Sequence, residues 1–170
     1  MKVNFKVVLL LAGFVSLQTT AVLAQKFGYT NSAAILVEMP ATKSADAQLK
    51  TLQEQLTKEL KDKETEFNAK VQEYLQAADT GTLTPKQMQD QEAALTAEQQ
   101  NLQKLQNDAM VKIQNKRDQL YSPILEKVQL AIDAVGKEKG YDIIFDVAAL
   151  NVILFANESE DVTALIKAKL

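Results

Sequence analysis

The segment Asp79-Thr-Gly-Thr-Leu-Thr-Pro85 is the clearest break in a long stretch, residues 42–139, that otherwise holds almost no Gly or Pro. This stretch is rich in Gln, Glu, Lys, Leu and Ala, which favour helix over strand. Within the break, Thr84 can cap a helix that starts at Pro85, and Gln87 completes a capping box. The pattern therefore predicts two long helices that fold back on each other, with their tip near residues 79–85.

The apolar residues of both predicted helices recur at steps of three, four or seven, which is typical of a narrow coiled-coil seam. The first helix is expected over residues 42–78 and the second over 85–139. The expected seam of the first helix consists of Leu49, Leu52, Leu56, Leu60, Phe67, Val71 and Leu75. The expected seam of the second consists of Met88, Leu95, Leu102, Leu105, Ala109, Ile113, Leu120, Ile124, Val128, Ile132 and Val135.

Short strands are predicted on both sides of this hairpin, over residues 26–30, 141–146 and 151–155. Asn31 or Ser32 can cap a short helix that ends before Pro40, and Gly140 ends the second long helix. A last helix is expected to begin after Ser159. The fold class is therefore α+β: a coiled-coil arm, residues 42–135, inserted in a small β head made of residues 25–41 and 136–170.

A head of this size buries little surface, and its few strands have open edges and apolar faces. Pairing with strands from other copies would cover both the edges and the faces. We therefore expect a homo-oligomer with a shared β core and arms that surround a cavity. The expected core residues are Phe27, Tyr29, Ile143, Phe145, Val152 and Leu154.

The N-terminal residues have the organisation of a secretory signal peptide. Lys2 and Lys6 precede an apolar run, and Val22-Leu23-Ala24 supplies small residues before a predicted cleavage site at Gln25. The apolar run is shorter than the roughly 20 residues that span a bilayer, so no stable membrane anchor is expected. Removing the two lysines of residues 1–24 changes the net charge from −3 to −5, which argues against nucleic acid as a partner.

The composition also excludes much catalytic chemistry. The chain has no His and no Cys, so the common zinc sites and the Ser-His or Cys-His nucleophile pairs are impossible. Asp142 and Asp146 lie on one side of a predicted strand, but no other liganding group is evident near them, and a solvated rim is the favoured interpretation. We predict no catalytic residue, no metal site and no cofactor.

Several segments resemble the Skp/OmpH family of periplasmic chaperones. The resemblance rests on Lys26-Phe-Gly-Tyr-Thr-Asn31, the long polar hairpin, Gly140-Tyr-Asp-Ile-Ile-Phe-Asp146 and Asp161-Val-Thr-Ala-Leu-Ile166. It implies a jellyfish-shaped trimer that holds unfolded outer-membrane proteins between its arms, in the periplasm and without ATP. Well-known members are strongly basic, whereas this chain is acidic.

A chaperone of this kind needs many weak contacts with its clients, so apolar residues on the arm are the candidate client-binding residues. These candidates are Phe67, Tyr74, Leu75, Leu83, Met88 and Met110. Packing within the arm is favoured for Leu75 and Met88, which lie on the predicted seam. Tyr74 falls off the predicted seam and Leu83 lies at the tip. The alternative function is a structural envelope adaptor that carries a periplasmic coiled-coil hairpin.

Overall fold

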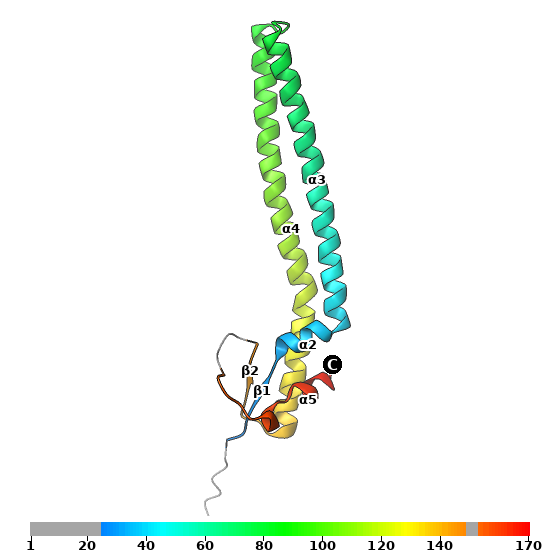
Figure 1. Cartoon of the computed structure of the whole chain (residues 1–170), viewed down its shortest axis with the longest axis vertical. Coiled ribbons are helices and arrows are strands. Elements are labelled where there is room, and N and C mark those ends of the chain that lie inside the picture. The colour runs from blue at the N-terminus through cyan, green and yellow to red at the C-terminus, as the bar shows by residue number, and fades with distance from the viewer. Residues whose placement is uncertain (1–24, 149–152) are drawn as a thin grey trace, which may run out of the picture.

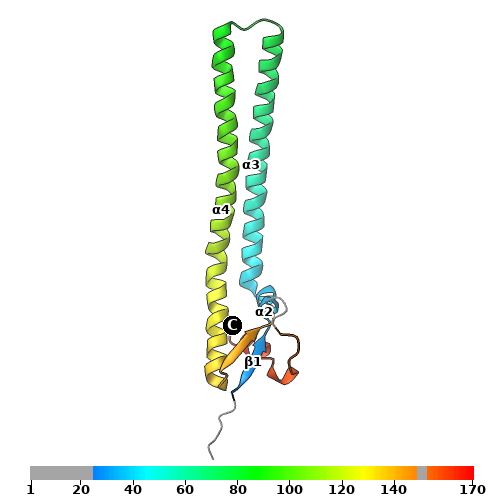
Figure 2. The same cartoon turned by 90° about the vertical axis from the view of Figure 1, so that its left-hand side faces the viewer.

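A computed structural model describes residues 25–148 and 153–170 of the chain, and a long helical hairpin dominates it (Figure 1). Helix α3 spans Pro40–Asp79, and helix α4 spans Pro85–Lys139. The two helices lie side by side in both views and meet at a short turn (Figure 2). The predicted hairpin and the position of its tip are confirmed.

The sequence signals at the helix ends operate as predicted. The Thr84 hydroxyl accepts a hydrogen bond from the Gln87 amide, and the Gln87 side chain accepts one from the Thr84 amide. Gly140 adopts a φ of 68°, in the left-handed region that favours glycine, and ends α4. Asn31, one of the two expected caps, accepts a hydrogen bond from the Ala34 amide at the start of α2, Ser32–Glu38.

A small head lies at the base of the hairpin (Figure 2). Strand β1, Phe27–Thr30, pairs in parallel with β2, Ile143–Asp146. On its other side, β1 meets the segment before α5, Thr163–Lys167, through a bridge between Tyr29 and Asp161. Among the described residues, β2 is therefore an edge strand with one open side.

Two local predictions for the C-terminal segment are wrong. Ser159 does not cap a helix but lies in a short 3-10 turn, Glu158–Glu160, and α5 begins at Thr163. The physical reason is that the chain first pairs with β1, because the Val162 amide donates a hydrogen bond to the Tyr29 carbonyl at 2.9 Å.

The strand expected over residues 151–155 is also absent from its described part. Val152 lies outside the described residues, and residues 153–155 are not a strand. The expected strand would have been buried, whereas Leu154 is 93% exposed and Phe155 is 88% exposed. A strand needs a hydrogen-bonded neighbour, and nothing in the described chain supplies one here.

The core lies where the head meets the lower arm. The side chains of Ile35, Val135, Val162 and Ile166 are almost completely buried, and they come from α2, α4 and the C-terminal segment. The base of α3 joins this core through Ala45. Gly28 in β1 is required by close packing, because an added Cβ would lie 2.9 Å from the Tyr141 ring.

Candidate functional site

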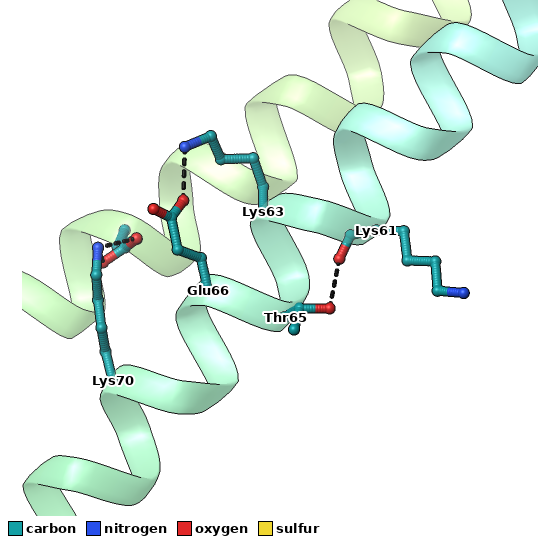
Figure 3. Close-up of polar contacts among 6 residues, drawn as sticks. Lys61, Lys63, Thr65, Glu66 and Lys70 are labelled. Atoms are coloured by element: carbon teal, nitrogen blue, oxygen red, sulfur yellow. Dashed lines mark hydrogen bonds and ion pairs between the residues drawn. The ribbon is translucent and has the colours of Figure 1, made fainter.

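Polar contacts cross between the two helices of the upper arm, beside a seam of half-buried apolar residues. Lys70 of α3 reaches across to α4 and pairs with Glu98 at 2.7 Å (Figure 3). Nearer the tip, the Tyr74 hydroxyl donates a hydrogen bond to Glu92 at 2.5 Å. We define the upper arm as the part of the hairpin between Leu56 of α3 and Ala109 of α4, which includes the tip. None of the residues between these two is buried. The upper arm is therefore a long surface with almost no core.

Other polar contacts stay within one helix. Figure 3 shows Lys63 and Glu66 on one face of α3, and their ion pair has a length of 2.6 Å. The hydrogen bond from Lys63, with the charges of Lys63 and Lys70, lowers the pKa of Glu66 below its ordinary value. All these groups are solvent-exposed, so each contact stabilises the helix by only a few tenths of a kcal/mol, roughly.

The predicted client-binding residues divide into two groups by exposure. Leu75 and Met110 are exposed, by 52% and 65% respectively. The half-buried members are Phe67, Tyr74, Leu83 and Met88. The structure thus brings the candidates onto one arm but does not gather them into a single patch. Their role in binding stays a prediction.

The seam assignment near the tip was wrong by one residue. Tyr74, and not Leu75, faces α4, because Tyr74 lies three residues after Val71 and its hydroxyl finds Glu92. The same hydrogen bond, followed by burial and by the charge of Glu92, raises the pKa of Tyr74. Leu75 consequently points away from the seam and is available to solvent.

A second candidate surface lies on the head. We define the head face as the five exposed apolar side chains Phe27, Ile143, Phe145, Leu154 and Phe155. The rings of Phe27 and Phe145 lie on paired strands, with their centroids 6.3 Å apart. A concavity of about 510 Å³ borders Phe27, Phe145, Leu154 and Phe155. Large apolar surfaces of this kind mark interaction sites in soluble proteins.

The head face contains four of the six residues expected in an oligomer core: Phe27, Ile143, Phe145 and Leu154. Tyr29 lies beside this face and is half-buried within the single chain. Sequence reasoning missed Phe155, although it belongs to the same apolar run as Leu154. It also missed exposed apolar residues of α4, namely Val111, Leu125 and Leu130, which lie off the seam.

Asp142 and Asp146 act as hydrogen-bond acceptors within the head. Asp142 accepts from the Lys26 amide at 2.7 Å, and Asp146 accepts from the amides of Ser32 and Ala148, both exposed contacts. Burial would raise the pKa of Asp146, but the hydrogen bonds from Ser32 and Ala148 outweigh burial and lower it. Through these hydrogen bonds, Asp142 is connected to Lys26 just before β1, and Asp146 of β2 is connected to the start of α2.

Residues 25–148 and 153–170 contain neither a metal-binding cluster nor a helix suited to cross a membrane. No group of three or more His, Cys, Asp or Glu side chains is arranged to hold a metal ion there. None of the helices in these ranges combines the length and the apolar character needed to cross a membrane. The predicted signal peptide, residues 1–24, lies outside the described residues.

Comparison with known proteins places the chain in a family. Residues 26–170 match the family described as outer membrane protein (OmpH-like). The chain belongs to the OmpH-like family. This confirms the resemblance seen in the sequence and covers the head, the arm and the C-terminal segment. No curated protein matches the chain at a significant level.

The fold is also found in a solved structure. A crystal structure of a candidate outer membrane chaperone (OmpH-like) from Caulobacter crescentus superposes with a TM-score of 0.70. The similarity covers 85% of this chain and 82% of that protein, at 19% sequence identity. At that identity the comparison supports the OmpH-like fold of this chain and no finer property.

Proposed function

We propose that this protein is an exported, ATP-independent holdase of the periplasm that keeps unfolded outer-membrane proteins from aggregating. It works as a homo-oligomer, a trimer by resemblance to the Skp/OmpH family, with clients held between the arms. The family membership and the chaperone-like fold support this proposal. The single observation that carries it is the uncovered head face at the base of a nearly coreless arm.

The head face supports assembly for two reasons. First, Leu154 and Phe155 are almost fully exposed in the single chain, a costly state for an apolar leucine and an apolar phenylalanine. Second, β2 has an open edge among the described residues, and isolated two-stranded sheets are marginal in water. A strand from another copy would satisfy the open edge and cover the apolar side chains together.

The surface of the arm is suited to weak binding of many unfolded clients and not to tight recognition of one client. Exposed Leu75 and Met110, and half-buried Leu83 at the tip, are separated by polar surface. Each buried methylene contributes only about 0.8 kcal/mol, so binding needs many such contacts and favours no single client sequence. Contacts of this strength also allow release without an energy source.

Assembly is tested by charging the head face. Replacing Leu154 and Phe155 with Asp should convert an oligomer into a monomer, as measured by light scattering after size-exclusion chromatography. Val37→Asp is the matched control, because Val37 is an apolar residue of α2 that is 69% exposed and lies outside the head face. A processed wild-type protein that is monomeric at micromolar concentration would contradict the proposal.

Holding is tested by diluting a urea-unfolded outer-membrane β-barrel protein into buffer without ATP and following turbidity. The wild-type protein should suppress aggregation at a near-stoichiometric ratio. A short-armed variant lacking residues 61–74 and 94–107 keeps the heptad phase of both helices and removes the contacts of Lys70 with Glu98. It should still assemble but protect the client poorly, whereas equal protection would exclude the arms from holding.

The alternative, an envelope adaptor, finds less support. Such adaptors need several strands on each side of their hairpin. Before the arm, the described chain has only β1 and the short α2. Co-purification with one fixed membrane partner, instead of varied clients, would favour the adaptor.

A further inference from the structure

The lower arm carries a groove that differs chemically from the rest of the hairpin. We define the lower-arm groove as the space of about 800 Å³ between the face of α3 from Ser44 to Gln55 and the face of α4 from Asp108 to Gln119. It lies next to a second concavity at the corner of α2 and α3, and the two share Ser44 and Gln48. The groove is open to solvent, so an extended segment can lie along it.

Lys116 breaks the coiled-coil pattern at this groove. The seam of α4 runs through Ala109, Ile113 and Leu120, and Lys116 falls on the intervening seam position, three residues after Ile113. It is half-buried, although a seam position usually holds an apolar residue. Within the described chain, no carboxylate lies within ion-pair distance of Lys116 or of its groove neighbour Lys112.

The walls of the groove offer both hydrogen bonds and apolar surface. Gln55, Asn115 and Gln119 line it, and each side-chain amide can donate and accept. None of these three amides is bonded to another side chain of the described residues. Leu52 and Val111 add apolar area, and Val111 is 58% exposed. Amides beside apolar patches suit the main chain and alternating side chains of an extended peptide.

Charge favours one kind of peptide. The α3 wall of the groove holds no charged residue, and Asp108 is the only acidic residue among those that line it. Lys112 and Lys116 thus form a small basic pair on a chain with net charge −3. Because no carboxylate of the described residues pairs with either lysine, both ammonium groups can pair with carboxylates of a ligand.

We propose that the lower-arm groove binds an extended segment of an unfolded client in which apolar residues alternate with carboxylates. The amides contact its main chain, Val111 and Leu52 contact its apolar side chains, and Lys112 and Lys116 pair with its acidic side chains. The inference rests on the proposed holdase function and adds a site and a preference to it.

The site is tested with two single-cysteine variants of α4, since the chain has no native Cys. Val111→Cys lies in the groove, whereas Leu130→Cys replaces an apolar α4 residue that is 61% exposed and lies outside the groove lining. Each is labelled with an environment-sensitive dye and titrated with a short peptide of alternating valine and glutamate. We expect a spectral shift at position 111 and little at position 130.

The preference is tested with charge-matched variants. Lys112→Gln with Lys116→Gln should weaken binding of the glutamate peptide roughly three- to tenfold, as expected for two partly exposed ion pairs. Binding of a valine–glutamine peptide should be unchanged. Lys61→Gln with Lys104→Gln removes the same charge elsewhere on the arm and should change neither. Lys112→Arg with Lys116→Arg keeps both positive charges and should retain the wild-type affinity for the glutamate peptide.

Several outcomes would overturn the inference. Equal dye shifts at positions 111 and 130, or equal wild-type affinity for the two peptides, would exclude the groove as a selective site. If the dye at position 111 shifted its spectrum when the labelled protein was diluted without peptide, the groove would be occupied by a second copy of the chain. If the glutamine variant had a less stable arm but unchanged peptide affinity, Lys116 would serve to fix the alignment of α3 with α4 and not to bind a ligand. In each case the turbidity assay still decides the holdase function separately.

Discussion

The head and the upper arm are built on opposite principles. In the head, Ile35, Val135, Val162 and Ile166 are removed from water almost completely, and segments distant in sequence depend on one another. In the upper arm no residue is buried, and polar contacts such as Lys70 with Glu98 join the helices. Cooperative stability therefore belongs to the head, and the arm is free to open locally at little cost.

The largest difference in stability between the two regions is expected when one apolar side chain is truncated in each. Ile166→Ala removes a completely buried side chain from the head and should lower the free energy of unfolding by about 2–4 kcal/mol. Leu102→Ala truncates a half-buried seam residue of the arm and should cost about 1 kcal/mol or less. Chemical denaturation at one fixed protomer concentration measures both. Equal losses would mean that the arm has a core of its own.

The sequence was sufficient for features that depend on local chemistry. The capping box at Thr84, the end of α4 at Gly140 and the hairpin itself were all predicted and are confirmed. The seam near the tip was not, because both Tyr74 and Leu75 fit the spacing after Val71. Only the position of Glu92 on the opposite helix decides between them.

Features that depend on a partner surface were harder to predict. Leu154 and Phe155 were expected to be buried, yet no described residue of the chain covers them. The groove was missed because the predicted seam stepped by seven residues from Ile113 to Leu120 and passed over Lys116. A lysine on a seam position was the available signal.

Two glycines with the same backbone geometry provide the next test. Gly140 in the head and Gly81 at the tip have φ values of 68° and 65°, and neither would crowd an added Cβ. Alanine at either position adopts a strained conformation that costs about 1 kcal/mol. Gly140→Ala should show this full cost in global unfolding, and Gly81→Ala should show less, because the tip can open separately. Identical costs would indicate that head and arm unfold as one unit.

The head should also respond to acid more than the arm. The folded pKa of Asp146 lies below its ordinary value, so its contribution is complete above the ordinary carboxylate range, near pH 4, and is lost as the pH falls through the lower folded pKa. At neutral pH, Asp146→Asn should cost about 1 kcal/mol after allowance for solvent screening. The difference from wild type should shrink progressively below about pH 4.

Asp90 of α4 supplies the control for this pH dependence. No described residue donates a hydrogen bond to it, so Asp90→Asn should leave stability nearly unchanged at every pH. Thermal unfolding of the three proteins between neutral and acidic pH measures the comparison. A difference between Asp146→Asn and wild type that grows on acidification would contradict the assigned sign.

The smallest expected effect concerns the polar contacts of the arm. Tyr74→Phe keeps the ring on the seam and removes only the hydrogen bond to Glu92, whose exposure limits its value to a few tenths of a kcal/mol, roughly. Global stability should therefore be unchanged within error. Hydrogen exchange should nevertheless speed up for the amides near Tyr74 and Glu92 and stay constant around Ile166. Faster exchange in both regions would couple the arm to the head and remove the distinction between them.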